Sequence, residues 1–264
     1  MMKQIDLNCD LGESFGPYTI GNDQQVMQYI TSANIACGYH AGDPLCMEQT
    51  VAAAKQAGVK IGAHPGFPDL MGFGRRELRC SSREIKAYIQ YQVGALGAFA
   101  AAHQMSIQHV KPHGALYNMA CRDTDLANAI VDGIQSLSRD LILLCPAGSQ
   151  MEQAALRAGL PVACEVFADR AYDSTGNLVP RSQKGSVILD PKEVVERAVG
   201  MALEGTVQSI TGEVISLRAD SICIHGDTPG AISLVRELRK ALLAAGVTPT
   251  PLEQFVRRSG GDQL

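Results

Sequence analysis

Short apolar runs rich in β-branched residues alternate along this chain with longer segments of helical periodicity, and this alternation restricts the possible folds more than any other feature. The pattern is typical of parallel strands joined by helices. Seven strands are predicted, at residues 4–9, 33–37, 59–63, 109–111, 141–145, 162–166 and 221–224. Helices are predicted near residues 44–57, 82–103, 124–137, 149–158, 191–204 and 230–245. The sequence therefore predicts an α/β fold.

The length of the chain predicts a single domain. Its 264 residues are about the size of one (β/α) barrel, and no linker rich in serine and proline divides them. Two apolar runs flank Thr211-Gly212 and predict a β-hairpin, inserted near residues 206–217 before the last strand. We therefore expect one barrel domain over residues 1–264, with a loose C-terminal tail from about residue 257.

The first predicted strand favours a closed barrel over an open, doubly wound sheet. Asp6, Asn8 and Asp10 alternate with apolar residues, so the three polar side chains share one face of the strand. An open sheet covered by helices on both sides has no suitable place for three such groups, whereas the interior of a barrel near its mouth has one. The expected fold therefore resembles a TIM barrel.

Composition and charge exclude several classes of protein. With 46% hydrophobic residues the chain can bury a large core without disulfides, and its eight cysteines include no C-x-x-C pair, as in a reducing cytoplasm. No signal peptide is visible, and no segment reaches the roughly 18 apolar residues of a membrane span. The net charge is −4, with scattered lysine and arginine, which disfavours nucleic-acid binding. A cytoplasmic protein that binds neither membranes nor nucleic acids is expected.

Polar clusters follow almost every predicted strand. The carboxyl ends of barrel strands share one mouth, where the active sites of this architecture lie. Four of the six histidines occupy such positions, namely His40, His64, His113 and His225. A single histidine at a strand end is usually structural, but four in equivalent positions indicate a functional site.

The remaining histidines and the cations have less specific patterns. His103, at a helix end, and His109, at the start of a strand, are expected to be structural. Lys111 and Arg170 are the cations predicted to reach the mouth, although each could equally form an ordinary salt bridge. The long loops 65–79, with adjacent Arg75-Arg76, and 169–184 are candidate lids or anion clamps, or else oligomer contacts.

Several catalytic motifs are absent from the sequence. It contains no phosphate loop, no nucleophile elbow, no H-E-x-x-H and no G-x-G-x-x-G after a strand. Metal chemistry is harder to exclude, because Asp6 and His64 could bind a divalent ion together with His113 or His225.

Six segments together resemble the LamB/YcsF family, at residues 6–13, 34–44, 62–69, 110–118, 165–170 and 224–229. The resemblance extends in order from about residue 3 to residue 250. It implies an irregular seven-stranded (β/α) barrel related to the polysaccharide-deacetylase fold. It also implies one component, the A subunit, of a three-subunit, ATP-dependent 5-oxoprolinase, a cyclic amide hydrolase that converts 5-oxo-L-proline to L-glutamate.

Within that reaction the residues receive the following expected roles. The residues assigned to catalysis are Asp6, Asp10, His64 and His113. The residues assigned to substrate binding are Asn8, Glu13, Asn34, His40, Lys111, Tyr117, Glu165, Arg170, His225 and Asp227. Without a phosphate loop here, ATP, with Mg²⁺ possible, is assigned wholly or partly to the partner subunits B and C, and no protein-bound metal is expected. The alternatives are a stand-alone metal-dependent deacetylase or amidohydrolase, and a non-catalytic substrate-binding subunit.

Overall fold

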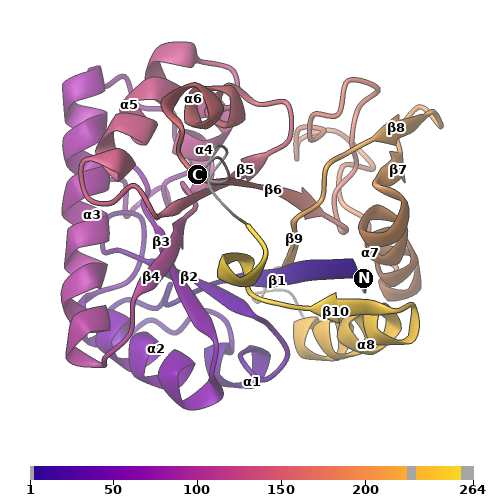
Figure 1. Cartoon of the computed structure of the whole chain (residues 1–264), viewed down its shortest axis with the longest axis horizontal. Coiled ribbons are helices and arrows are strands. Elements are labelled where there is room, and N and C mark those ends of the chain that lie inside the picture. The colour runs from indigo at the N-terminus through magenta and orange to yellow at the C-terminus, as the bar shows by residue number, and fades with distance from the viewer. Residues whose placement is uncertain (1–2, 225–229, 257–264) are drawn as a thin grey trace, which may run out of the picture.

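Seven parallel strands form a closed barrel in the computed structural model, which describes residues 3–224 and 230–256 (Figure 1). The strands are β1 (Lys3–Leu11), β2 (Ser32–Ala36), β3 (Lys60–His64), β4 (Ile107–Val110), β5 (Ile142–Pro146), β6 (Val162–Phe167) and β9 (Ser221–Ile224). They pair in the order β1-β2-β3-β4-β5-β6-β9, and β9 pairs back with β1. The predicted TIM-like barrel of seven strands is confirmed.

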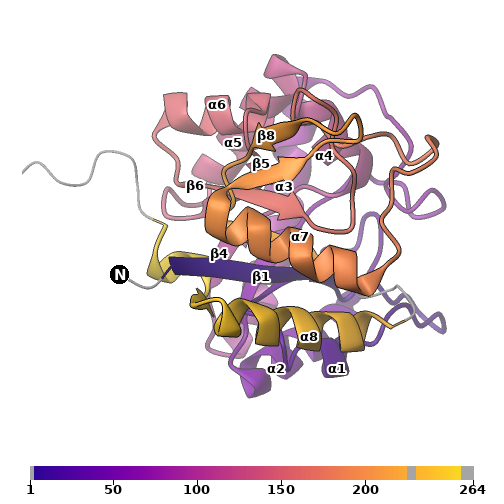
Figure 2. The ribbon, with the colours of Figure 1, turned by 90° about the vertical axis from the view of Figure 1, so that its right-hand side faces the viewer.

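Helices surround this barrel on its outer side (Figures 1 and 2). The six predicted helices are α2 (Pro44–Ala57), α3 (Ser82–Ala102), α5 (Thr124–Gln135), α6 (Gln150–Ala158), α7 (Pro191–Glu204) and α8 (Ala231–Ala244). Three short helical segments were not predicted, namely α1 (Asp23–Val26), α4 (Gly114–Ala120) and the 3₁₀ turn η1 (Leu252–Gln254). A short strand, β10 (Val247–Pro249), pairs with the start of β1 outside the closed ring.

Local sequence signals define the ends of the helices. The carboxylate of Asp43 accepts hydrogen bonds from two backbone N–H groups at the start of α2, and Gly58 ends that helix in the left-handed conformation with φ of 70°. Ser81 and Glu84 form a reciprocal capping box at the start of α3. These caps fix where α2 begins and ends and where α3 begins.

The apolar core lies between the strands and the helices, whereas the barrel interior is polar. Ile5, Leu7 and Cys9 of β1 are fully buried in the apolar layer. Asp6 and Asn8 lie on the other face of the strand, where their side chains bond residues of β2, β6 and β9. The period-two prediction for this strand is therefore confirmed, and the interior is where chemistry can be placed.

The predicted hairpin is present before β9. It consists of β7 (Thr206–Gln208) and β8 (Val214–Ser216), which pair antiparallel. The tail predicted from residue 257 lies outside the described residues. Within the described ranges, no helix combines the length and the apolar character needed to cross a membrane.

Candidate functional site

The carboxylate of Asp6 is fully buried inside the barrel, near the amino-terminal ends of the strands. Thr31 Oγ1 and Ser32 Oγ donate to Asp6 Oδ1 over 2.6 and 2.5 Å. Ser221 Oγ donates to Asp6 Oδ2. Burial raises the pKa of Asp6 to about 6, although the three hydroxyl donors oppose that rise.

The hydroxyls around Asp6 are themselves oriented by donors. They accept hydrogen bonds from Leu7 N, from Gln108 Nε2 and from Asn8 Nδ2, over 2.6 to 2.8 Å. Each hydroxyl therefore directs its own proton toward Asp6. In the described part of the chain these hydroxyls supply all the hydrogen bonds of the carboxylate, so Asp6 does not join the histidines as the sequence led us to expect. It belongs to the floor of the barrel.

Lys111, which follows β4, occupies the centre of the barrel. Its ammonium lies 3.0 Å from Asp10 Oδ1 and 3.0 Å from Glu165 Oε2. Asn8 Oδ1, at 3.3 Å, and Cys223 Sγ, at 3.2 Å, complete its surroundings. Burial by itself lowers the pKa of Lys111, but these acidic neighbours outweigh it and raise the pKa well above its usual range. Lys111 is thus a permanent counter-ion for two carboxylates, with its three donors already engaged.

A chain of amides joins this charge cluster to β4. Asn34 Nδ2 donates to Asn8 Oδ1 and to Asp10 Oδ1, each over 2.7 Å, and Asn34 Oδ1 lies 2.6 Å from His109 Nε2. Burial lowers the pKa of His109 to about 3, so this ring is neutral, and its contact with Asn34 suits the structural role expected for it. The ring fits because its neighbour is Gly62, where a Cβ would lie only 2.0 Å from His109 Nε2.

Glu165 and Tyr117 lie inside the barrel beside Lys111. The Tyr117 hydroxyl donates to Glu165 Oε1 over 2.6 Å, and burial raises its pKa well above the usual range. Tyr117 projects from α4, a helix that the sequence analysis did not predict. Both side chains are buried, and the hydrogen bond between them holds Glu165 in the charge cluster of Lys111, Asp10 and Glu165.

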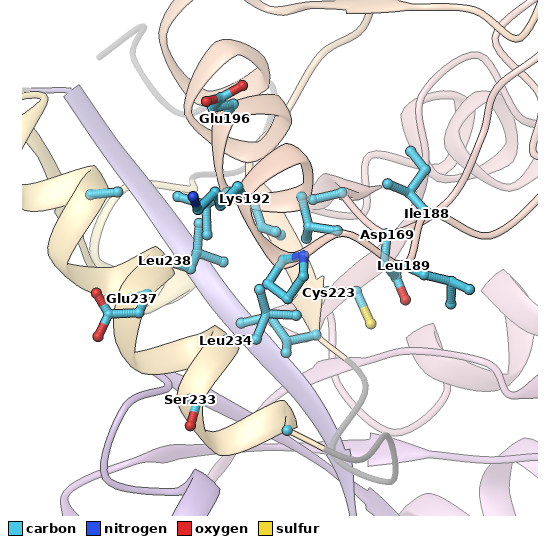
Figure 3. A pocket seen from close by; sticks show the side chains of 18 of the residues that line it. Asp169, Ile188, Leu189, Lys192, Glu196, Cys223, Ser233, Leu234, Glu237 and Leu238 are labelled. Carbon is cyan, nitrogen blue, oxygen red and sulfur yellow. The ribbon is translucent and has the colours of Figure 1, made fainter.

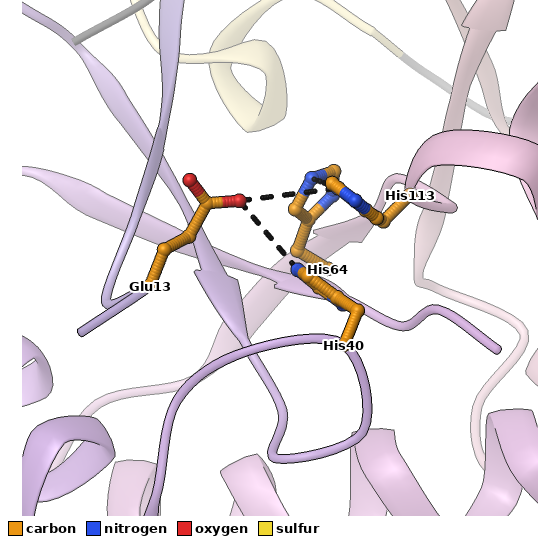
Figure 4. Close-up of side chains that lie close together, drawn as sticks. All are labelled: Glu13, His40, His64 and His113. Atoms are coloured by element: carbon orange, nitrogen blue, oxygen red, sulfur yellow. Dashed lines mark hydrogen bonds and ion pairs between the residues drawn. The ribbon is translucent and has the colours of Figure 1, made fainter. Parts of the chain in front are cut away.

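Above the charge cluster, three histidines and one glutamate converge at the mouth (Figure 4). One ligand-type atom from each of Glu13, His40, His64 and His113 lies within 4.8 Å of all the others. His64 Nε2 is 3.0 Å from His113 Nδ1, and Glu13 Oε1 is 3.5 Å from His40 Nε2 and 3.9 Å from His113 Nδ1. His64 Nε2 also lies 3.4 Å from Asp10 Oδ2. These are residues that follow or end β1, β2, β3 and β4, as the strand-end argument predicted.

The outer hydrogen bonds of two of these rings determine their tautomers. His64 Nδ1 lies 2.7 Å from the carbonyl oxygen of Lys111, and His113 Nε2 lies 2.8 Å from that of Phe73. Because a carbonyl only accepts, these two nitrogens carry protons. In the neutral rings, the lone pairs of His64 Nε2 and His113 Nδ1 therefore face each other. Burial lowers the pKa of His113 to about 3.

His40 is buried beside this pair without a hydrogen-bond partner for either ring nitrogen among residues 3–224 and 230–256. Its ring stacks on that of His113, with 3.6 Å between ring centres and 3° between ring planes. Burial lowers the pKa of His40 well below its usual range, and the neighbouring His113 and His64 lower it further. Buried polar atoms are seldom left unbonded, so the position of His40 needs an explanation.

The long loop at residues 65–79 lies over the histidines. Phe73, in the left-handed conformation with φ of 53°, supplies the carbonyl that accepts from His113. The exposed Arg75 guanidinium lies 5.1 Å from the centre of the Phe73 ring, whereas Arg76 is ion-paired with Asp69. The two adjacent arginines thus have different contacts, and only Arg75 is placed beside the mouth.

Arg170, which was expected to bind an anion at the mouth, has its guanidinium bonded to backbone carbonyls of the loop that follows β6. Its Nε donates to the Ser186 carbonyl over 3.2 Å, and its Nη2 donates to the Val179 carbonyl over 2.7 Å. Arg170 therefore fastens the loop that follows β6. The other two predicted binding residues, His225 and Asp227, lie outside the described residues.

A pocket of about 880 Å³ opens beside the mouth between α7 and α8 (Figure 3). Leu234 and Leu238 of α8 contribute to its apolar wall, and it reaches Cys223 of β9. Arg75 and Arg181 also line it. The four residues of the histidine cluster do not line this pocket, but Arg75 borders it and its charge acts on two of the histidines.

The chain matches one known protein family along almost its whole length. The profile of the LamB/YcsF family matches residues 5–257. The chain belongs to the LamB/YcsF family. Among curated relatives, a Pyrococcus horikoshii protein named as the A subunit of 5-oxoprolinase is 52% identical over 254 residues, which are 96% of this chain and 100% of the relative. A protein of the same name from Alkaliphilus metalliredigens is 55% identical over 241 residues, which are 91% of this chain and 94% of the relative.

Solved structures agree with this LamB/YcsF assignment. The lactam utilization protein from Thermus thermophilus superimposes with a TM-score of 0.90 at 46% identity, and the match covers 94% of this chain and 99% of that one. A putative cellobiose-phosphate cleavage protein from Enterococcus faecalis, at 12% identity and a TM-score of 0.59, shares the fold alone.

Several residues that build the interior of this LamB/YcsF barrel were not predicted from the sequence. The hydroxyls of Thr31, Ser32 and Ser221 were missed, as were Gln108 and the thiol of Cys223. One signal was available, because an acid inside a strand must find hydrogen-bond donors on neighbouring strands. Small hydroxyl residues at the starts of predicted strands were the candidates for that role.

Proposed function

We propose that this chain is the A subunit of a 5-oxoprolinase that cleaves 5-oxo-L-proline to L-glutamate with hydrolysis of ATP to ADP and phosphate. The names of its relatives support the assignment. The structural observation that carries it is the carboxylate of Asp10 at the mouth, ion-paired with Lys111 and 3.4 Å from His64 Nε2. A carboxylate and imidazoles at one mouth suit proton transfer during the opening of an amide.

The chemistry of the lactam explains why ATP enters a hydrolysis. The amide is stabilised by resonance, and phosphorylation of its oxygen would remove that stabilisation and make the ring carbon electrophilic. Water then adds to this carbon while a base takes one of its protons, and the ring C–N bond breaks as a proton is delivered to the leaving nitrogen. The resulting acyl phosphate is hydrolysed by a second water to L-glutamate and phosphate. Because Asp6 lies in the barrel floor and Asp10 reaches the mouth, we assign the base to Asp10.

The substrate carboxylate requires a cation that is not already neutralised. Lys111 is engaged by Asp10 and Glu165, and Arg170 by two carbonyls, so neither serves this role well. Arg75 is exposed beside the mouth, and within the described ranges no carboxylate forms an ion pair with it. We assign the substrate carboxylate to Arg75, since guanidinium groups bind carboxylates through two parallel hydrogen bonds.

ATP is assigned to the partner subunits B and C, wholly or partly, with Mg²⁺ as its counter-ion. The reason is the absence of a phosphate loop from the sequence of this chain. One observation favours a second candidate, a metal-dependent amidohydrolase that acts alone, because Glu13, His40, His64 and His113 form a donor set of the kind that binds metals.

Reconstitution of the complex tests the proposal. We expect the chain mixed with subunits B and C to release L-glutamate from 5-oxo-L-proline only when ATP is present, and the chain alone to release none. Glutamate and phosphate are measured in parallel. Turnover by the pure chain without ATP would instead establish the stand-alone amidohydrolase.

In the complex, Asp10→Asn is expected to lower turnover by about a hundredfold to ten-thousandfold. Unchanged turnover would favour a non-catalytic binding subunit.

The role of Arg75 gives a prediction about substrate affinity. In the complex, Arg75→Ala is expected to raise the KM for 5-oxo-L-proline by about ten- to a hundredfold and to change kcat less, since about 1.5–3 kcal/mol of charge-assisted hydrogen bonding is lost. Arg83→Ala, another exposed arginine, at the start of α3, is the matched control and should leave both constants unchanged. A normal KM for Arg75→Ala would place the carboxylate site elsewhere.

A further inference from the structure

The hydrogen bonds of the histidine cluster leave its inner atoms unexplained. His64 Nε2 and His113 Nδ1 lie 3.0 Å apart, and their protons are directed outward to carbonyl oxygens. Two facing lone pairs repel unless a positive centre lies next to both. His40, fully buried and without a hydrogen-bond partner within the described ranges, is the third imidazole at this point. His64 Nε2 and His113 Nδ1 are therefore two acceptors directed at one position, and the buried ring of His40 lies beside them.

Two of the separations in the cluster match the edges of a metal coordination shell, and a third is about half an ångström longer. Bonds of about 2.1 Å place neighbouring ligand atoms about 3.0 Å apart in an octahedral site and about 3.4 Å apart in a tetrahedral one. The corresponding separations here are 3.0 Å between His64 and His113, 3.5 Å between His40 and Glu13, and 3.9 Å between His113 and Glu13. A small movement of the Glu13 or His113 side chain would shorten the 3.9 Å separation to the length of a tetrahedral edge.

The outer contacts of the two best-placed rings have the form found around bound metals. Metal-binding histidines usually donate their other ring N–H to a carbonyl or carboxylate, which fixes the tautomer and the orientation of the ring. His64 does so to Lys111 O, and His113 does so to Phe73 O. These carbonyls lie at the end of β4 and in the loop over the site. The rings are thus oriented before any ligand arrives.

We propose that Glu13, His64 and His113 bind one divalent transition-metal ion of the zinc class at the mouth of the barrel, with His40 as a fourth donor. Imidazole and carboxylate ligands together suit zinc and its first-row neighbours. The ring of His40 is parallel to that of His113, so His40 Nε2 reaches the ion only after its ring tilts out of the stack. His40 is therefore the weakest of the four ligands.

This set differs from the one expected from the sequence, in which Asp6 accompanied two histidines. Asp6 is bound by three hydroxyls in the floor, whereas Glu13, in the loop that follows β1, reaches the histidines directly. The inference also reverses the expectation that no metal is bound. It stands independently of the proposed reaction, although a divalent ion beside Asp10 could polarise a substrate carbonyl when bound.

Zinc binding by the isolated full-length chain tests the inference without ATP, partner subunits or 5-oxo-L-proline. The chain is stripped with a chelator and titrated with Zn²⁺ in competition with a chromophoric chelator. One Zn²⁺ per chain is expected. His64→Ala and His113→Ala should each weaken binding by more than the roughly 10–100-fold that loss of an outer-shell partner costs. His40→Ala should weaken it less than either.

The matched control is His103→Ala. His103 is a partly exposed histidine that pairs with Glu48, 2.9 Å away, and does not belong to the cluster, so its removal should leave zinc affinity unchanged. Circular dichroism shows whether each variant folds. For variants that do not fold, X-ray absorption of zinc bound to the unaltered chain gives the answer, because a shell of nitrogen and oxygen with imidazole scattering is expected.

Three results would overturn the inference. The first is the absence of zinc binding to the folded chain. The second is binding that survives both His64→Ala and His113→Ala. The third is a shell containing sulfur, which would place the ion on some of the eight cysteines. Failure of ATP-dependent turnover in the reconstituted complex bears only on the proposed function, since none of these measurements involves the reaction.

Discussion

Replacing Lys111 by methionine is expected to lower the free energy of unfolding by about 3–5 kcal/mol, which is the usual cost of removing one partner from a buried ion pair. The ammonium neutralises Asp10 and Glu165, and its side chain is only 4% exposed. Methionine fills a similar volume but leaves two carboxylates close together without a cation. The same variant should abolish turnover of the complex, because Asp10 loses the group that positions it.

Chemical denaturation followed by circular dichroism measures this loss, and two further variants assign its cause. The double variant Lys111→Met/Glu165→Gln should recover part of the stability, because one of the two uncompensated charges is gone. Lys240→Met removes an exposed lysine that pairs with Glu237 on α8, and should change stability by less than about 0.5 kcal/mol. A Lys111→Met variant as stable as the Lys240→Met control would contradict the counter-ion role.

The fold was largely predictable because its signals are local and repeated. Alternating strands and helices, capping residues such as Asp43 and Ser81, and the polar face of β1 each belong to one short segment of sequence. The helix α4 was missed because it is only seven residues long and begins at Gly114, next to Pro112-His113, where the sequence predicts a strand-end loop. Short helices depend on tertiary packing more than on their own sequence.

The sequence indicated which residues lie inside the barrel and near its mouth, but not how those residues are placed relative to one another. A period of two shows that Asp6 and Asp10 share a face of β1, yet it does not give their depths, and about 13 Å of strand separates residues four positions apart. Asp6 consequently lies in the floor and Asp10 near the mouth. The bonds of Arg170 to two loop carbonyls were unpredictable for a related reason, since a position after a strand does not determine where a long, flexible side chain bonds.

The pairing of Glu13 with three histidines could not be derived from spacing. These residues follow or end four different strands, and their convergence depends on barrel closure and on the path of each loop. The strand-end rule brought them to one mouth, which is as far as the sequence leads. Their mutual distances, and the outward hydrogen bonds that leave lone pairs facing inward, are properties of the folded molecule alone.

Asp6→Asn is expected to destabilise the fold by about 2–4 kcal/mol at neutral pH, because buried partners that lose a hydrogen bond each cost about 1–3 kcal/mol. Three hydroxyls donate to Asp6, and each of them already accepts a hydrogen bond from another donor, which orients its proton toward Asp6. An asparagine amide group would present N–H protons to hydroxyl protons. Any loss of turnover in the complex should therefore accompany a lower melting temperature.

The loss of stability caused by Asp6→Asn depends on pH, and the direction of the pKa shift of Asp6 determines how. The pKa of Asp6 is raised from 3.8 to about 6 in the folded protein, so the folded state binds the proton more tightly than the unfolded chain. The resulting stabilisation, at most about 3 kcal/mol, is complete below the unfolded pKa and is lost as the pH rises through about 6. Asparagine does not titrate, so the stability gap between the two proteins should widen as the pH falls from about 7 to about 4.

Denaturation curves of both proteins at several pH values measure this gap. Asp125→Asn, in the exposed first turn of α5, is the matched control, and should differ from the unaltered chain by less than about 1 kcal/mol over the same range. Ser221→Ala removes one donor to Asp6 and should raise its pKa further, since that hydroxyl is the strongest of the influences that hold it down. One result would contradict this structural role, namely an Asp6→Asn protein of unaltered stability whose complex has lost turnover. Asp6 would then be the catalytic base, because the amide would leave the fold intact and abolish only the reaction.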